Sequence, residues 1–180
     1  MGRIAERIVA NELEARGFVV SHLNKDGVAP NADLVAISPS RMLQVQVKGA
    51  TNKSKDRLWV GYGYFTDEII EGKRPVFNGR QGFYKADFVV LVAVRSATKY
   101  TCFVLPVDIA EDAAQLHRNT FRVRGWPHGR THLVIEPGRH VEKSDPRVAE
   151  CRAIVAEEIA TLDRYRDERG WANLASTEKS

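Results

Sequence analysis

The sequence contains no apolar stretch long enough to span a bilayer. The longest apolar run, from Phe88 to Val94, has the length of a buried strand. Only two cysteines are present among 180 residues, Cys102 and Cys151, which excludes a disulfide framework and favours two buried thiols. Residues 1–6 lack the apolar region of a secretory signal. We therefore expect a cytoplasmic protein.

Several common catalytic motifs are also absent. No glycine-rich phosphate-binding loop appears, because Gly61 and Gly63 lie within a strand-like pattern. No serine-hydrolase or cysteine-protease motif is present. His128, His132 and His140 have a spacing that zinc sites tolerate, but their segment is not helical in pattern and no nearby cysteine completes a ligand set. The sequence therefore does not favour zinc.

Charge is distributed unevenly along the chain. Residues 1–140 hold 20 Lys and Arg against 14 Asp and Glu, whereas residues 141–180 hold 7 against 9. The whole chain has a formal net charge of +4 and a pI near 9.2. This balance suits a nucleic-acid partner, although many proteins that bind no nucleic acid carry a modest positive charge.

Apolar periodicity predicts alternating helices and strands. Helical spacing of apolar residues predicts a helix over 3–16, with Gly17 as the stop. Strand-like runs predict strands at 18–23, 32–38, 42–48, 58–65, 86–94, 100–105 and 133–135. Further helices are expected at about 108–118 and 145–169, and 67–71 matches one helical turn. The order αβββ, then ββαβα, is typical of an α/β fold around a mixed sheet.

The length favours a single domain, and a hydrophobic content of 43% suffices for a real core. We expect the core to cover residues 1–140 and a C-terminal helical extension of the same domain to cover 141–172. Residues 173–180 are expected to form a flexible tail, because the ends of domains are often poorly ordered.

Three polar residues are predicted to meet at one end of this sheet. Asp33 begins a strand, and Gln46-Val47-Lys48 ends the next strand, thirteen residues later. Side chains two residues apart on a strand share a face, so Gln46 and Lys48 lie on one side and the valines on the other. If the two strands form a hairpin through 39–40, Asp33 lies close to Gln46 and Lys48.

This set of residues suits phosphodiester hydrolysis. The reaction needs a hard cation to hold the phosphate and activate water, and Mg²⁺ prefers oxygen ligands. Asp33 would supply a charged ligand, and Gln46 and the backbone carbonyl of Val47 would supply neutral oxygens. Lys48 would orient the attacking water or stabilise charge on the phosphate, an effect typically worth about two to three decades in rate.

The pattern Ala32-Asp33…Gln46-Val47-Lys48 resembles the signature of the PD-(D/E)xK nuclease superfamily. The N-terminal segment is most similar to archaeal Holliday-junction resolvases, in which a glutamate on the first helix lies eleven residues before a Gly-Phe step, as Glu6 lies before Gly17-Phe18. The resemblance covers about residues 2–50. It implies a restriction-endonuclease-like αβββαβ core, DNA cleavage that depends on Mg²⁺ or Mn²⁺, and Glu6, Asp33, Gln46 and Lys48 at active-site positions.

The sequence departs from this signature at two positions. Ala32 replaces the first proline, which is common in so loose a motif. Gln46 replaces the acidic residue, so the site loses one negative charge and needs Glu6 as an additional ligand to restore it. Glutamine at this position is similar to the Mrr-type restriction branch. The alternative is a catalytically inactive nucleic-acid-binding module of the same fold.

Each of these residues also has an ordinary structural interpretation. Asp33 suits a turn cap, and Lys48 suits a solvated strand end. Glu12 lies nearer than Glu6 to the centre of the apolar face of the first helix, so the resemblance alone selects Glu6, and a surface ion pair is its alternative role. An interaction protein with a chance motif is a further alternative for the whole chain.

Basic residues outside the motif are candidates for contacts with DNA. Residues 113–135 contain no acidic residue, and Phe121 and Trp126 are placed to stack on bases, although an ordinary solvated loop would look similar. The candidate phosphate contacts are Lys53, Lys55, Arg57, Arg118, Arg122, Arg124 and Arg130. A cut through both strands needs two active sites and so favours a homodimer, but no residue identifies its interface.

Overall fold

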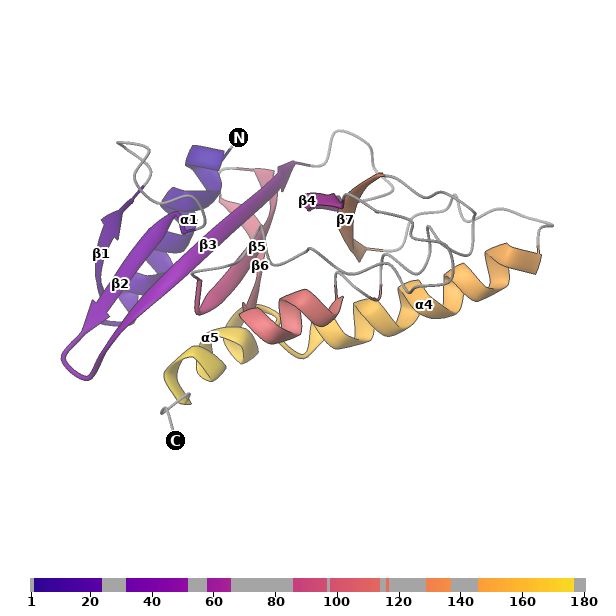
Figure 1. Ribbon diagram of the computed structural model, residues 1–180. Coiled ribbons are helices and arrows are strands. Elements are labelled where there is room, and N and C mark those ends of the chain that lie inside the picture. Colours follow the sequence, from indigo (N-terminus) through magenta and orange to yellow (C-terminus); the bar gives the residue numbers. More distant parts are fainter. Residues whose placement is uncertain are drawn as a thin grey trace.

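A five-stranded mixed sheet forms the centre of the protein (Figure 1). In this computed structural model, the residues described are 2–23, 32–51, 58–65, 86–96, 98–113, 116, 129–136 and 146–176. The sheet has the order β1-β2-β3-β5-β6, in which β3 and β5 are parallel and the other neighbours antiparallel. Its strands are β1 (Val19–His22), β2 (Leu34–Ser38), β3 (Arg41–Thr51), β5 (Phe88–Ser96) and β6 (Lys99–Pro106).

A second, smaller sheet lies beyond the end of β3 (Figure 1). It pairs β4 (Leu58–Phe65) with β7 (Gly129–Glu136) in antiparallel fashion. The register shifts between Gly61 and Gly63, where two glycines interrupt an otherwise strand-like sequence, so the bulge suggested by these glycines is present.

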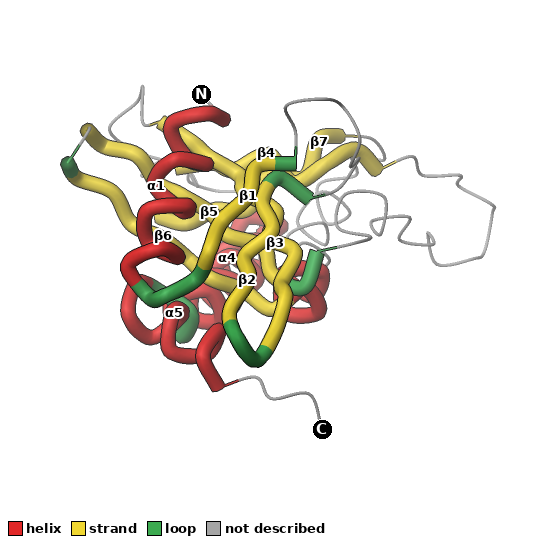
Figure 2. Tube along the Cα trace, turned by 90° about the vertical axis from the view of Figure 1, so that its left-hand side faces the viewer, coloured by secondary structure: helices red, strands yellow, loops and turns green. Residues whose placement is uncertain are grey.

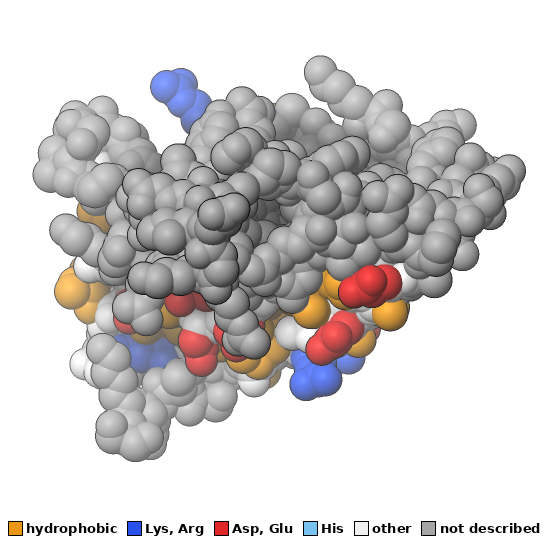
Figure 3. Space-filling model, turned by 45° about the vertical axis from the view of Figure 1, so that its right-hand side comes forward, with side chains coloured by type: hydrophobic (Ala, Val, Ile, Leu, Met, Phe, Trp, Pro, Cys, Tyr) orange, Lys and Arg blue, Asp and Glu red, His pale blue; other side chains and the backbone are white. Residues whose placement is uncertain are grey.

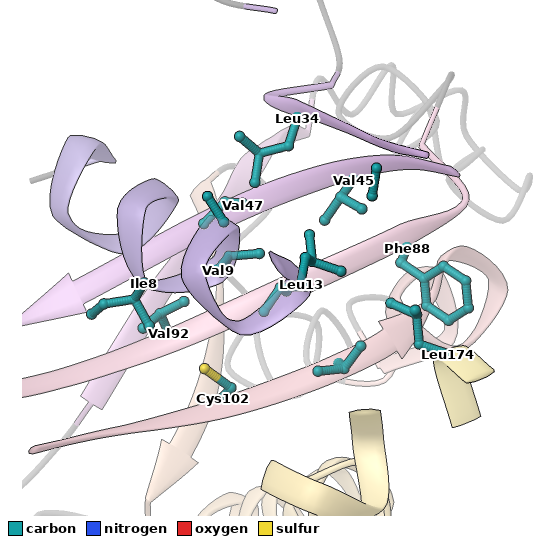
Figure 4. Close-up of a cluster of buried hydrophobic side chains, with 14 of the residues drawn as sticks. Ile8, Val9, Leu13, Leu34, Val45, Val47, Phe88, Val92, Cys102 and Leu174 are labelled. Atoms are coloured by element: carbon teal, nitrogen blue, oxygen red, sulfur yellow. The ribbon is translucent and has the colours of Figure 1, made fainter. Parts of the chain in front are cut away.

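Helix α1 (Gly2–Ala15) covers one face of the large sheet (Figures 2 and 4). Its apolar residues recur at helical spacing and are buried against alternate residues of β3 and β5, among them Val45, Val47 and Val92. The helix ends at Gly17, whose φ of 84° is a backbone conformation that glycine adopts without a steric penalty. The backbone N–H of Phe18 then donates to the carbonyl of Leu13 over 3.1 Å, closing the helix end.

The opposite face of the sheet is covered by residues 107–113, which are helical, and by helix α4 (Pro146–Asp163). Leu91, Leu105 and Leu162 form the centre of this second cluster. Since β5 is covered on both faces, its residues from Phe88 to Val94 are all buried, which explains why this strand reads as a continuous apolar run.

The outer edge of β6 is closed by the segment that follows α4. The backbone N–H of Val104 donates to the carbonyl of Tyr165 over 2.9 Å, and the N–H of Cys102 donates to the Asp167 carboxylate over 2.9 Å. These bonds require the chain to leave the helix after Asp163 and start α5 (Asp167–Ser176) in a new direction. The prediction of one continuous helix to about residue 169 is therefore wrong.

Helix α5 is held to the N-terminal part of the chain. Arg16 of the α1 terminus pairs with Glu168 over 2.6 Å, and its guanidinium lies over the Trp171 ring at 4.8 Å. Arg41 donates a hydrogen bond to the carbonyl of Leu174, whose side chain is buried in the α1 cluster. The helix thus continues past residue 173, where the sequence suggests that a flexible tail begins.

The exposed surface of α4 carries acidic side chains. Glu150 and Glu157 are both exposed. Figure 3 shows Asp and Glu side chains beside Lys and Arg side chains on one face of the molecule. In the part of the chain that the structure describes, no helix combines the length and apolar character needed to cross a membrane.

The predicted α/β fold with a mixed sheet and a C-terminal helix is confirmed. Every predicted strand is present, and β3 and β7 extend beyond their predicted ends. The helical turn suggested at 67–71 and the end of the helix expected at 108–118 fall outside the described residues. So does the rest of 66–85, which holds the connection leading into β5.

Candidate functional site

The β2–β3 hairpin brings Asp33 next to the Gln46-Val47-Lys48 segment. The antiparallel register runs from Ser38 opposite Arg41 to Leu34 opposite Val45. If this register continued, Gln46 would be the partner of Asp33. The backbone N–H of Asp33 instead donates to the carbonyl of Val45 over 2.9 Å, one residue out of register, so the regular ladder ends at Leu34 and Asp33 lies beside the Val45–Val47 segment of β3.

The Asp33 carboxylate is fixed by the backbone of the neighbouring strand. Its Oδ2 atom accepts a hydrogen bond from the N–H of Val47 over 2.7 Å, and the side chain is half-buried. This distance is typical of a strong bond from an amide to a charged acceptor. The carboxylate is therefore held beside β3 at the level of Gln46 and Lys48.

Gln46 is the one buried uncharged polar residue among the described core residues, with 5% of its surface exposed. Its side-chain oxygen, Oε1, is fully buried, and no donor in the described structure lies within hydrogen-bonding distance of it. Leaving a buried acceptor unsatisfied costs about 1–3 kcal/mol. A polar residue at this position therefore calls for a physical explanation.

Gln46 and Lys48 lie on the sheet face opposite helix α1. In the parallel register, Gln46 pairs with Val89 and Lys48 with Leu91, both of which belong to the cluster beneath α4. Val47 points to the α1 side. The alternation predicted for this strand is confirmed, and Lys48 is half-buried two residues along the same face from Gln46.

Glu6 lies on the α1 side of the sheet and contacts a residue that the sequence did not suggest. Its Oε2 atom is 4.0 Å from Nδ1 of His22, and both side chains are partly exposed. His22 ends β1 and pairs with Leu34, the residue next to Asp33. Glu6 therefore lies at the same end of the sheet as Asp33, on the face away from Gln46. A lone histidine in a four-residue strand gives no sequence signal for this contact.

Glu12, the competitor of Glu6 on the first helix, has structural partners. Its carboxylate accepts a hydrogen bond from the Tyr100 hydroxyl over 2.7 Å and another from Arg16 over 2.5 Å. The bond to Glu12, together with burial, raises the pKa of Tyr100 to about 12. Glu12 thus joins α1 to β6 and, through Arg16, to α5.

Asp87 is a structural counterpart of Asp33 on the other side of β3. Its carboxylate accepts a hydrogen bond from the N–H of Gln44 over 2.8 Å, and its own N–H donates to the Gln44 carbonyl over 2.7 Å. Both aspartates follow an alanine and precede a buried strand. A bond to β3 is therefore not by itself a sign of function, and Asp33 differs in that its carboxylate bonds to Val47, the residue next to the buried Gln46.

The side-chain and backbone oxygens of this segment are of the kind that hard divalent cations prefer. The Asp33 carboxylate, the Gln46 amide oxygen and the Val47 carbonyl come from adjacent backbone positions on two paired strands. In the part of the chain that the structure describes, no three His, Cys, Asp or Glu side chains form a metal-binding cluster. A cation site here would depend on amide and backbone oxygens, which suit Mg²⁺ or Mn²⁺.

The candidate DNA-contact residues cannot be placed around this site. Lys53, Lys55 and Arg57 lie outside the described residues, as do Arg118, Arg122 and Arg124. Arg130 lies in β7 opposite Tyr64, but its side chain is not among those described. His128 and His140 also fall outside, so the histidine segment stays untested.

Comparison with known proteins finds likeness to solved structures. No protein-family model and no curated protein sequence matches the chain. The fold is similar to that of a bacterial homing endonuclease, I-Ssp6803I, with a TM-score of 0.43 and 18% sequence identity over 90% of this chain and 94% of that chain. A likeness of this size indicates nothing about the activity or the ligands of the present chain.

Proposed function

We propose that the protein is a metal-dependent nuclease that hydrolyses phosphodiester bonds in DNA, acting as an endonuclease. The observation that carries this proposal is the buried, unsatisfied oxygen of Gln46 at the level of the Asp33 carboxylate. A bound cation would give that oxygen a partner and would offset the cost of burying it.

The chain's own atoms define how a cation would be held. Asp33 supplies the charge, while its Oδ2 atom is fixed in place by the N–H of Val47. Gln46 supplies a neutral oxygen that is already desolvated, and the Val47 carbonyl supplies another. Such preorganisation lowers the cost of arranging ligands around a cation. When bound, Mg²⁺ or Mn²⁺ would hold the scissile phosphate and acidify a water molecule.

Lys48 provides the positive charge on the same face. It is two residues from Gln46, about 7 Å along the strand, which is roughly the span of a phosphate and an attacking water molecule. Its ammonium group orients that water or stabilises the charge that develops on the phosphate. Because Lys48 is half-buried, its charge is screened less than that of an exposed lysine.

The choice of glutamine at position 46 has an energetic consequence. The site holds one carboxylate beside one lysine, so its cation affinity should be lower than that of a site with two carboxylates. Glu6 is the additional carboxylate at this end of the sheet, and we propose that it contributes to the site.

DNA as the substrate is supported by the charge of the chain. The formal net charge is +4, and the excess of Lys and Arg lies in residues 1–140, which include the site. A polyanion is attracted by such a distribution, and its binding weakens as salt rises.

A cleavage assay tests the proposal. The wild-type chain is incubated with supercoiled plasmid, single-stranded DNA and a four-way junction, with Mg²⁺ or Mn²⁺ and with chelator. We expect cleavage that needs the cation and falls at least about 100-fold in Lys48→Ala, because the charge aimed at the phosphate is lost. Lys99→Ala, which removes an exposed lysine of β6, is the matched control and should cleave normally.

Two other results would change the conclusion. Cleavage that is equally fast in Lys48→Ala and in the control would mean that the activity arises elsewhere. DNA binding without cleavage on every substrate, and without cation binding by calorimetry, would support the inactive binding module instead.

A further inference from the structure

The contact between Glu6 and His22 sits beside the proposed cation site and has no role in the function described so far. The carboxylate and imidazole approach to 4.0 Å, with 22% and 32% of the side chains exposed. A surface ion pair of this exposure typically contributes less than about 1 kcal/mol to stability. Holding α1 to the sheet does not need this contact, because the helix already buries Ala5, Ile8 and Val9.

The position of His22 follows from the pairing of β1 and β2. Its neighbour two residues earlier, Val20, packs on the α1 cluster, so the alternation of the strand places His22 on the same side. One residue beyond the His22–Leu34 pair, the N–H of Leu23 donates to the carbonyl of Asp33 over 3.0 Å. His22 is therefore one residue from the backbone bond that fixes Asp33.

Asp33 lies at the end of the sheet where β2 begins. Strand β2 begins at Leu34, and Asp33 bonds through its carboxylate to the edge of β3. The Asp33 carboxylate therefore lies near the plane of the sheet, between the face that holds Gln46 and the face that holds Glu6. A carboxylate directed round this end from α1 can meet a cation held by Asp33.

We propose that His22 is a positioning residue, which holds the Glu6 carboxylate so that one of its oxygens faces the cation held at Asp33. This inference rests on the proposed function. At 4.0 Å the two groups form an ion-pair contact, and a small approach of either side chain would let Nδ1–H donate to one carboxylate oxygen and leave the other oxygen for the cation. Residues that orient metal-binding carboxylates in this way usually affect metal affinity by about 10- to 100-fold when replaced.

Calorimetric titration of the full chain with Mn²⁺ tests this role without a catalytic readout. His22→Ala should bind Mn²⁺ about 10- to 100-fold more weakly than wild type. His22→Asn places a side-chain N–H close to the position of Nδ1 and should restore most of the affinity. His22→Gln places its N–H near the position of Nε2 and should not.

A double-mutant cycle separates an action through Glu6 from a direct effect. If His22 acts through Glu6, the variant Glu6→Gln with His22→Ala should bind Mn²⁺ no more weakly than Glu6→Gln alone. Glu14→Gln, on the exposed side of α1, is the control for loss of a carboxylate and should bind as wild type does. Thermal unfolding of every variant checks that the fold is retained.

The outcomes distinguish the two proposals. Wild-type binding that is unchanged in His22→Ala, or weakened equally in His22→Asn and His22→Gln, would overturn the role of His22 and leave the nuclease proposal intact. Additive losses in the double variant would show that His22 does not act through Glu6. A wild-type chain that binds no Mn²⁺, even with DNA present, would overturn both.

Discussion

Asp33 and Asp87 flank strand β3 from its two sides, and each carboxylate accepts a hydrogen bond from a backbone N–H of that strand. The distance from the Val47 nitrogen to Oδ2 of Asp33 is 2.7 Å, and that from the Gln44 nitrogen to Oδ2 of Asp87 is 2.8 Å. The two residues have nearly the same structural environment. They differ in that the Asp33 carboxylate bonds to Val47, the residue next to Gln46 and its buried side-chain oxygen.

This pair permits a matched comparison. Asp33→Asn and Asp87→Asn both keep an oxygen for the backbone bond and lose a negative charge. We expect Asp33→Asn to lose Mn²⁺ binding and at least about 100-fold in cleavage rate, because the charged ligand is removed. Asp87→Asn should cleave as wild type does. Calorimetry measures Mn²⁺ binding, and plasmid cleavage measures the rate. An equal loss of both in the two variants would mean that Asp33 has only a structural role at the start of its strand.

Gln46→Met removes the unsatisfied oxygen and nearly preserves the side-chain volume. We expect the free energy of unfolding in chelator to rise by about 1–3 kcal/mol, because a buried acceptor without a partner is destabilising. Mn²⁺ should stabilise wild type and leave this variant unchanged. Urea unfolding with and without Mn²⁺ measures both. A variant less stable than wild type in chelator would contradict the unsatisfied state of Gln46.

Gln46→Glu adds the charge that the site lacks. We expect Mn²⁺ affinity to rise about tenfold or more, since cation affinity increases with the number of charged ligands. Stability in chelator should fall, because a buried carboxylate near Asp33 is poorly solvated. Calorimetry and urea unfolding test the two directions. Unchanged affinity would place the cation away from position 46.

Alkaline pH should destabilise the fold through two groups. The hydrogen bond to Glu12 raises the pKa of Tyr100 to about 12, and burial raises the pKa of Cys102 to about 12. Both groups keep their protons in the folded state at pH values where the unfolded chain loses them, so stability is complete below about pH 9 and is lost as pH rises towards 12. Urea unfolding between pH 8 and 11 should show this decline, with a smaller slope in Tyr100→Phe.

Gly170→Ala should be more harmful than Gly17→Ala. A Cβ atom at position 170 would lie 2.0 Å from the carbonyl oxygen of Tyr165, whereas at position 17 it meets nothing within 4 Å. We expect a loss of about 3 kcal/mol for the first, from steric overlap. About 1 kcal/mol is expected for the second, from the positive φ alone. Thermal unfolding of both variants checks the order, and equal losses would argue against the close contact at Gly170.

The hairpin that builds the site could be predicted because its information is local. A period of two in β3 separates Gln46 and Lys48 from the valines, and the short turn fixes the register that brings Asp33 beside the Val45–Val47 segment. The buried run of β5 was equally clear, because a strand covered on both faces needs apolar residues throughout.

The features that were missed depend on contacts between distant segments. The chain leaves the helix at residues 164–166, which contain neither glycine nor proline, because Tyr165 and Asp167 bond to the edge of β6. The contact of His22 with Glu6 requires the packing angle of α1 on the sheet. Neither contact produces a periodic pattern of residues from which it could be predicted.

The closure of β6 by residues far along the chain sets the order of events during synthesis. The N–H groups of Cys102 and Val104 donate to the Asp167 carboxylate and the Tyr165 carbonyl, respectively, and Arg16 bonds to Glu168, 152 residues away in the sequence. On a ribosome, the sheet emerges more than 50 residues before these partners do. Until α5 emerges, the growing chain presents an open strand edge, so its nascent form should need protection from self-association that the finished protein does not.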